Sequence, residues 1–98
     1  MKIIWSPLSV DRMTEISEYI AEDNPDASIK WVESIFEIID RLKQFPESGR
    51  IVPEIDKPHI REIIQGNYRI IYKVRQEEIF ILTVRHFKQI LPSEEVNE

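Results

Sequence analysis

Residues 60–88 read IREIIQGNYRIIYKVRQEEIFILTVRHFK, and this stretch decides the fold of the 98-residue chain. Its β-branched and aromatic side chains come in three runs of strand length. Gly66-Asn67, between the first two runs, suits a two-residue hairpin turn because glycine adopts positive φ freely. The polar stretch Arg75 to Glu78 separates the second run from the third. The stretch therefore predicts an antiparallel meander of three strands.

The pairing of these strands decides which cationic side chains share a face, because side chains alternate along a strand. A two-residue turn at Gly66-Asn67 places Arg61 and Arg69 on opposite faces. The second hairpin leaves two registers open. A four-residue loop sets Arg69 opposite Val84, whereas a loop one residue longer or shorter puts Arg69 and Arg85 on one face.

Two amphipathic helices are predicted before the meander. Ser6-Pro7 and Asn24-Pro25 each combine a capping side chain with a proline at the first helical position, where a missing N–H costs nothing. Apolar residues then recur at helical spacing, at Met13, Ile16 and Ile20 in the first helix and at Trp31, Ile35, Ile38, Leu42 and Phe45 in the second. We expect Trp31 and Phe36 to belong to the core, and the second helix to end at Phe45-Pro46.

These segments together predict the fold class. Lys2 to Trp5 is a short apolar run typical of a strand, and residues 51–59, with two prolines, indicate a loop or an edge extension. A helical hairpin needs a sheet to cover its apolar faces. The expected fold is α+β, with an N-terminal strand and a two-helix hairpin packed on an antiparallel sheet of three to four strands. We expect one domain over residues 1–92 and an acidic, frayed tail over residues 93–98.

Composition excludes several classes of site. The chain has no Cys, which excludes a disulfide framework, a thiolate zinc site and a Cys nucleophile. It has two His without accompanying metal-binding motifs and two Gly without a phosphate-binding loop, so we expect neither a metal nor a cofactor. No apolar stretch approaches the ~20 residues that a membrane span needs. A cytoplasmic protein without membrane partners is the expectation.

The formal net charge of −5 argues against a generic nucleic-acid binder. The charge is unevenly distributed, since residues 55–92 carry 7 Lys and Arg against 4 Asp and Glu, whereas residues 1–54 carry 6 against 11. The meander is therefore the basic part of an acidic molecule. An anionic ligand or an acidic partner is expected to bind there.

The cationic residues of the meander also allow metal-free chemistry on a phosphodiester. In that mechanism Arg69 and Arg85 hold the phosphate, and His86 transfers protons at a ribose hydroxyl. The alternative is that His86 is a strand-end residue without a catalytic role and that the arginines are solvated. The residues alone leave both open, so Arg69, Arg85 and His86 are candidates for catalysis only if the protein is a nuclease.

At this point the chain resembles the RelE/ParE superfamily of toxins from type II toxin-antitoxin modules. The resemblance covers residues 3 to about 90 and is carried by Phe45-Pro46-x-x-Gly49-Arg50, Ile60-Arg61-Glu62, Gly66-Asn67-Tyr68-Arg69-Ile70-Ile71-Tyr72 and Ile81-Leu82-Thr83-Val84-Arg85-His86. It implies a small domain with a helical hairpin packed on an antiparallel sheet. It also implies a cognate antitoxin whose C-terminal part wraps the toxin.

Within the superfamily the sequence is more similar to the ParE branch, which typically has Gly-Asn-Tyr-Arg in the hairpin and a His at the position of His86. That branch is associated with poisoning DNA gyrase. The implied candidates for binding the target or the antitoxin are Arg61, Tyr68, Arg69, Tyr72 and Arg85. The alternative is a RelE-like ribosome-dependent mRNA endonuclease, with the ribosome and mRNA as partners. No Tyr follows Tyr72, however, and where that branch usually has lysines before the second strand this chain has only Arg50, Lys57 and His59. A third possibility is an antitoxin-binding module of the same fold without toxicity.

Overall fold

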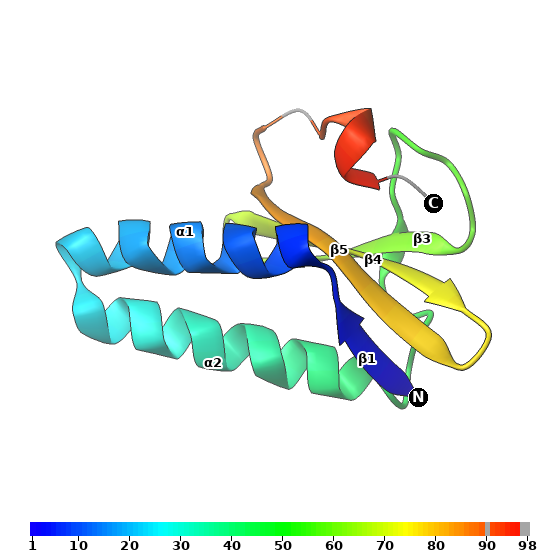
Figure 1. Ribbon diagram of the computed structural model, residues 1–98, viewed down its shortest axis with the longest axis horizontal. Helices are drawn as coiled ribbons and strands as arrows, with labels where there is room; N and C mark the ends of the chain where they lie inside the picture. The colour runs from blue at the N-terminus through cyan, green and yellow to red at the C-terminus, as the bar shows by residue number, and fades with distance from the viewer. Residues whose placement is uncertain (90, 97–98) are drawn as a thin grey trace.

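The computed structural model, which describes residues 1–89 and 91–96, places two antiparallel helices beside a five-stranded sheet (Figure 1). Its elements are β1 (Lys2–Trp5), α1 (Pro7–Asp23), α2 (Pro25–Leu42), β2 (Arg50–Ile51), β3 (Ile60–Gln65), β4 (Tyr68–Arg75), β5 (Glu78–His86) and a 3-10 helix (Ser93–Val96). The strand order is β1-β5-β4-β3-β2, with β1 parallel to β5 and the other pairs antiparallel. The predicted α+β fold is confirmed. The sheet has five strands instead of the expected three to four, because both β1 and the short β2 pair at the edges of the meander, and the parallel β1–β5 pair makes it mixed rather than antiparallel.

Both predicted helix caps are present. The Ser6 hydroxyl accepts a hydrogen bond from the Ser9 backbone N–H at 3.0 Å and donates one to the Leu82 carbonyl at 2.9 Å, which ties the start of α1 to β5. Asn24 joins the two helices and caps both, as the C-cap of α1 and the N-cap of α2. Its backbone N–H donates to the carbonyl of Ile20 at the end of α1, and its side chain accepts from the Ala27 N–H at the start of α2.

The first hairpin has the predicted register. Gln65 lies opposite Tyr68 and Arg61 opposite Tyr72, so that Arg61 and Arg69 are on opposite faces. Gly66 adopts a φ of 59°, the conformation that a primed two-residue turn requires of a glycine. The turn chemistry that the sequence contains is therefore enough to fix the register of this pair of strands.

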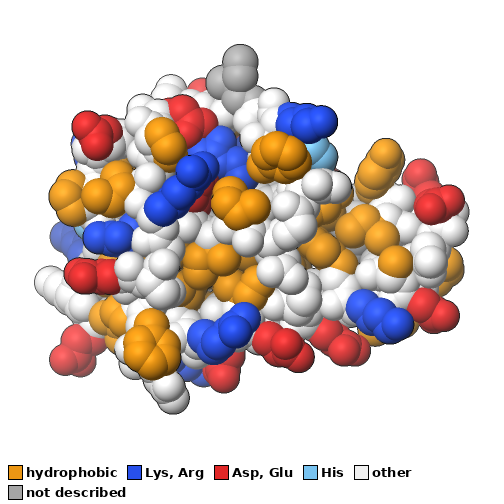
Figure 2. Space-filling model, turned by 180° about the vertical axis from the view of Figure 1, so that it is seen from behind, with side chains coloured by type: hydrophobic (Ala, Val, Ile, Leu, Met, Phe, Trp, Pro, Cys, Tyr) orange, Lys and Arg blue, Asp and Glu red, His pale blue; other side chains and the backbone are white. Residues whose placement is uncertain are grey.

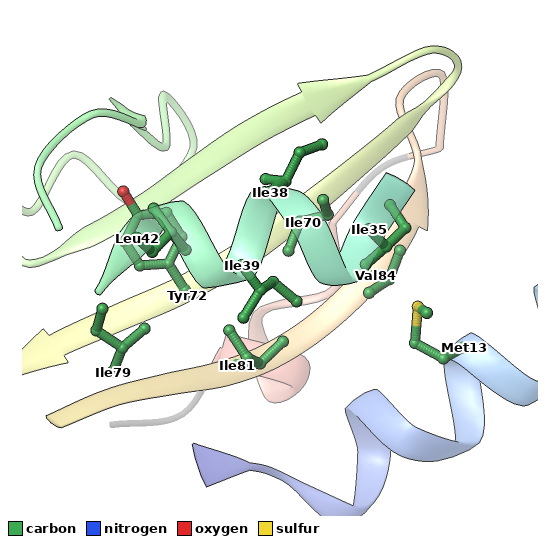
Figure 3. Close-up of a cluster of buried hydrophobic side chains, with 10 residues drawn as sticks. All are labelled: Met13, Ile35, Ile38, Ile39, Leu42, Ile70, Tyr72, Ile79, Ile81 and Val84. Carbon is green, nitrogen blue, oxygen red and sulfur yellow. The ribbon is translucent and has the colours of Figure 1, made fainter. Parts of the chain in front are cut away.

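Hydrophobic clusters lie on both faces of the sheet. The larger one fills the space between the helices and the sheet, and its buried members are Met13, Ile35, Ile38, Ile39, Leu42, Ile70, Tyr72, Ile79, Ile81 and Val84 (Figure 3). The other cluster lies on the opposite face and consists of Val52, Ile60, Ile71, Leu82, Leu91 and Val96. Since Leu91 and Val96 belong to it, the C-terminal segment covers part of the sheet face that the helices leave open.

Three expectations from the sequence were wrong in detail. Phe36 is 53% exposed, because it lies at the outer border of the apolar stripe of α2, whereas Trp31 packs against the core as expected. The helix ends at Leu42 rather than Phe45, which is exposed in the turn that follows. Residues 93–96 are not frayed, since they form the 3-10 helix and Val96 is buried, while residues 97–98 of the expected tail lie outside the described residues.

Candidate functional site

A β-bulge decides the arrangement of the two arginines that the sequence left open. The turn at Gln76-Glu77 starts a register that would place Val84 opposite Arg69. Leu82 has no partner on β4, because Ile81 pairs with Tyr72 and Thr83 pairs with Ile71. From Thr83 onward the pairing is therefore shifted by one residue. Arg69 therefore lies opposite Arg85 on the same face of the sheet. The bulge, rather than the length of the turn, produces this arrangement.

Arg69 is a buried ion with carboxylate partners. Its side chain is 6% exposed, its Nε donates to Glu62 at 2.6 Å, and its two terminal nitrogens donate to the two oxygens of Glu54 at 2.7 and 2.8 Å. Glu62 also accepts from the Nε of Arg50 at 2.6 Å. The hydrogen bonds between Arg69 and Glu54 raise the pKa of the guanidinium and lower the pKa of the carboxyl. This cluster fixes the segment after β2 on the sheet.

Arg61 and Tyr72 hold the turn between α2 and β2. The Arg61 guanidinium donates to the carbonyl of Gly49 at 2.9 Å, and the Tyr72 hydroxyl donates to the carbonyl of Pro46 at 2.8 Å while accepting from the Gly49 N–H at 3.0 Å. Burial raises the pKa of Tyr72. A Cβ on Gly49 would lie 2.6 Å from both the Glu62 carbonyl and the Tyr72 hydroxyl. The Phe-Pro-x-x-Gly motif is thus a packing motif in this fold.

The remaining candidates, Tyr68, Arg85 and His86, line one hollow of about 480 Å³. It lies between α1 and the end of the β4–β5 pair, and its other lining residues are Arg12, Glu15, Ile16, Tyr19, Val84 and Gln89. The structure therefore divides the six residues proposed from the sequence into two groups. Arg61, Arg69 and Tyr72 make contacts that stabilise the fold, whereas Tyr68, Arg85 and His86 border a surface cavity.

One wall of the hollow is aromatic. The Tyr68 ring contacts Trp31 edge-on at 5.2 Å between centroids and His86 at 5.5 Å, and His86 stacks on Phe87 at 5.2 Å. Burial raises the pKa of the Tyr68 hydroxyl. Tyrosine and histidine present flat apolar surface with a polar tip, which suits them to binding a protein partner.

The other wall is cationic, with Arg12 and Arg85, and both guanidinium groups bind the carboxylate of Glu95. Glu95 accepts from Arg85 at 2.6 Å, from Arg12 at 2.9 Å and from the Thr83 hydroxyl at 2.8 Å. Burial acts to raise the pKa of Glu95, but the hydrogen bonds from Arg12 and Thr83, together with the positive charges of Arg85 and Arg12, hold that pKa below its usual value. The hydrogen bond that Arg12 donates to Glu95 likewise raises the pKa of Arg12.

The three nuclease candidates do not converge on one point. Arg69 binds Glu54 and Glu62, Arg85 binds Glu95, and the His86 ring lies against Tyr68 with its Nδ1 accepting from the Lys88 N–H at 3.2 Å. Within residues 1–89 and 91–96, no group of His, Asp and Glu is arranged to hold a metal ion. A phosphodiester at this site would have to displace carboxylates from both arginines.

Two residues of the site were not predicted from the sequence. Arg12 is the only Lys or Arg in α1, an otherwise acidic helix, and that isolation was the available signal. Glu95 gave no signal, because it is one of several glutamates in an acidic terminal segment. Its role depends on a chain reversal after β5 that local sequence does not specify.

The face of the molecule seen from behind is mixed in character (Figure 2). Seen from behind, cationic and hydrophobic side chains share the upper central part of the face, and most carboxylates lie near its margin (Figure 2). None of the helices in the described part of the chain is long and apolar enough to cross a bilayer. The face thus offers charge and apolar area together, as protein interfaces do.

The comparisons with known proteins agree with this structure. Residues 3–91 match the family model described as the ParE toxin of the type II toxin-antitoxin system parDE. A protein of Sinorhizobium fredii, named as a candidate toxin, Y4kP, is 36% identical over 93 residues, which is 93% of each chain. A solved chain from the chromosomal ParDE toxin-antitoxin system of P. aeruginosa superposes with a TM-score of 0.73 at 22% identity, covering 90% of this chain and 97% of that one.

The family match spans nearly the whole chain, and the relative from S. fredii is 36% identical over 93% of both chains. This chain belongs to the ParE toxin family of type II toxin-antitoxin systems. The likeness to the P. aeruginosa structure supports the same fold. The expected resemblance to the RelE/ParE superfamily, and to its ParE branch, is confirmed.

Proposed function

We propose that this protein inhibits growth by binding a protein target, DNA gyrase, and that a cognate antitoxin neutralises it. Membership of the ParE toxin family supports the role as a toxin. The observation that carries the protein-binding mechanism is that Arg69 and Arg85 are already paired with carboxylates, while Tyr68 and His86 form an aromatic wall in the hollow that Arg85 also lines. Such a surface binds by shape and side-chain contact. A gyrase target would place its action in the cytoplasm.

The antitoxin is expected to contact the helical hairpin as well as the meander. An open, mostly apolar hollow of about 420 Å³ lies between α1 and α2, lined by Trp5, Val10, Met13, Thr14, Ser17, Val32 and Phe36. Its exposed aromatic ring is Phe36, which contacts Trp5 at 5.6 Å between centroids. A hollow of this form suits the apolar face of an amphipathic helix. The Tyr68 and Arg85 region remains a candidate for the rest of the contact.

The borders of this hollow give the partner helix a charge preference. On α1 the adjoining exposed positions include Asp11 and Glu18, and on α2 they include Glu33 and Glu37. Lys or Arg residues flanking the apolar face of the antitoxin helix would complement these carboxylates. The segment that reaches the basic meander, in contrast, is expected to be acidic.

Purified protein and gyrase provide the direct test of the proposed activity. The chain added to gyrase with plasmid DNA should abolish supercoiling or leave gyrase-dependent DNA breaks, and the product of the adjoining antitoxin gene should reverse the effect. No effect on gyrase, together with ribosome-dependent cleavage of mRNA, would identify the RelE-like alternative. No effect in either assay, with tight antitoxin binding, would indicate the module without toxicity.

The antitoxin contact can be tested separately with two exposed aromatic residues. Phe36→Glu places a charge in the hollow and should weaken antitoxin binding at least about tenfold, because an unpaired charge would be buried at the interface. Phe45→Glu is the matched control, since Phe45 is similarly exposed but lies outside this hollow. Equal binding by the two variants would exclude the hollow as the docking site.

A further inference from the structure

The contacts of Glu95 resemble those of a bound ligand more than those of a surface salt bridge. One oxygen of its carboxylate accepts from the Thr83 hydroxyl at 2.8 Å, and the other accepts from Arg85 at 2.6 Å and from Arg12 at 2.9 Å. The Glu95 side chain is 8% exposed, and Thr83 is fully buried. Two guanidinium groups and a hydroxyl converging on one carboxylate form a site for an oxyanion.

The donors at this site come from elements that exist without the C-terminal segment. Arg12 lies on α1, and Thr83 and Arg85 lie on β5. In the described part of the chain, the Nε atoms of Arg12 and Arg85 are buried and have no hydrogen-bond partner. Glu95 therefore leaves part of the donor capacity of the site unused. A ligand with more than one acceptor group would satisfy these donors better.

The segment that delivers Glu95 is attached mainly by side chains. Within residues 91–96, the backbone hydrogen bond of the 3-10 helix joins Glu95 to Pro92, and none of those described joins this segment to a strand. Its apolar anchors are Leu91 and Val96, which pack in the cluster on the open sheet face. A short segment held by two aliphatic side chains and one carboxylate can leave while the sheet stays intact.

We propose that Arg12, Thr83 and Arg85 form a binding site for a carboxylate of a protein partner, and that Glu95 occupies this site as a tethered ligand in the free protein. The partner's segment has an acidic residue beside an aliphatic one, as Glu95 stands beside Val96. It replaces the C-terminal segment on the sheet face. The site lies outside the hollow between the helices.

The surrounding charge favours a peptide over a nucleic acid. Glu15 lines the adjoining hollow and binds Arg12 at 3.0 Å, and the chain carries a net charge of −5. Successive phosphates would be repelled by these carboxylates, whereas a single acidic side chain within an apolar segment would not. Val96 and Leu91 also show that the neighbouring surface accepts aliphatic side chains.

The hexapeptide LPSEEV, which is residues 91–96 added in trans, provides the probe. Glu95→Ala in the full chain vacates the oxyanion site, so this variant should bind the peptide at least about tenfold more tightly than the wild type does. Glu94→Ala is the matched control, because Glu94 is exposed, and it should bind like the wild type. Binding should be measured by calorimetry and by NMR shifts of the Thr83 and Arg85 amides.

Two further changes test the chemistry of the site. In the Glu95→Ala background, Arg85→Ala should weaken peptide binding at least about tenfold, and so should a peptide with Gln in place of the glutamate next to its valine. Insensitivity to both changes would overturn the proposal. A hexathymidine strand that binds Glu95→Ala more tightly than the peptide does would overturn the choice of a protein partner.

The wild-type chain gives a second measurement in case Glu95→Ala fails to fold. Excess LPSEEV should compete with the tethered segment and accelerate hydrogen exchange at the amides of Glu95 and Val96, without changing exchange in β5 away from the site. The peptide with Gln should not have this effect. Exchange that stays constant at millimolar peptide would show that the segment is a fixed part of the fold and would overturn the proposal.

Discussion

Arg69 and Arg85 lie opposite each other across β4 and β5, yet their guanidinium groups bind different carboxylates. Arg69 binds Glu54 and Glu62, and Arg85 binds Glu95. Two like charges on facing positions would destabilise the sheet if both were unpaired. Because each guanidinium has its own carboxylate partners, the two arginines can occupy facing positions without this repulsion. These partners also give the two arginines different consequences on substitution.

Arg69→Ala is expected to destabilise the fold strongly. The substitution removes the Arg69 guanidinium from the fully buried Glu62, which keeps its ion pair with Arg50, and it breaks the ion pair between Glu54 and the sheet. Breaking a buried ion pair from one side typically costs about 3 to 5 kcal/mol of unfolding free energy. Urea denaturation monitored by circular dichroism measures this loss. Arg69→Met combined with Glu62→Leu should recover much of it, because no uncompensated charge is then buried.

Arg85→Ala is expected to be much milder, at about 1 to 2 kcal/mol, because Glu95 retains Arg12 and Thr83 as partners. Leu42→Ala provides the comparison for a core residue. Leu42 is fully buried, and its truncation should cost about 2 to 5 kcal/mol through lost burial and a residual cavity. A loss for Arg85→Ala as large as that for Leu42→Ala would show that Arg85 is a structural ion like Arg69.

The two glycines should respond differently to alanine. Gly49→Ala places a Cβ 2.6 Å from the Glu62 carbonyl and the Tyr72 hydroxyl, so the turn must move and its hydrogen bonds to Tyr72 and Arg61 are strained. Gly66→Ala meets no atom within 4 Å and costs only the strain of a positive φ, about 1 to 2 kcal/mol. Differential scanning calorimetry should therefore rank Gly49→Ala as the more destabilised. The reverse order would contradict the assigned packing of the turn.

Stability should fall in acid because of Glu54 and Glu95. The hydrogen bond from Arg69 lowers the pKa of Glu54. For Glu95, burial acts to raise the pKa, but the interactions with Arg12, Thr83 and Arg85 lower it, and the net effect is a lowered pKa. A carboxyl with a lowered folded-state pKa binds fewer protons when folded, so its stabilisation is fully present above the unfolded value, about 4.3, and is lost as the pH falls through the folded value. Urea denaturation should give a free energy that is level near neutral pH and declines below about pH 4.

Glutamine variants identify the groups responsible for this decline. Glu54→Gln and Glu95→Gln should each lower stability at neutral pH and make its decline in acid shallower, because the group that titrates has been removed. Glu94→Gln, at an exposed position, should reproduce the wild-type curve. An unchanged acid profile for both of the first two variants would show that neither carboxylate contributes through its ion pairs.

The parts of the fold that local chemistry specifies were predictable from the sequence. Ser6 and Asn24 define the helix starts, and Gly66 defines the register of the first hairpin. The register of the second hairpin was not predictable, because it depends on a bulge at Leu82 that no turn residue marks. Phe36 was misplaced because a stripe at helical spacing does not reveal which of its borders the sheet covers.

Of the candidate site, the residue types were predictable and their partners were not. The meander contains the arginines, but the carboxylates that bind them come from Glu54 in a loop and Glu95 in the C-terminal segment. Such contacts depend on how distant segments pack, which periodicity and turn signals do not report. The same limit explains why Arg69, for which the sequence predicts either a ligand-binding or a solvated side chain, is instead buried.

His86→Gln decides between the two mechanisms. A toxin that binds a protein target needs no proton transfer, and glutamine keeps the approximate size and polarity of His86 while Tyr68 still provides an aromatic ring in the hollow, so growth inhibition should remain largely intact. A metal-free nuclease that uses His86 to transfer protons would lose roughly 10²- to 10⁴-fold in cleavage rate. Arg69→Ala cannot discriminate, because it disturbs the fold in either case. The measurement is to induce the wild-type and His86→Gln chains without antitoxin and to follow DNA-damage signalling, plasmid supercoiling and mRNA ends together. A DNA-damage response from both chains supports the gyrase target, whereas mRNA cleavage within codons that disappears in His86→Gln would establish the nuclease instead.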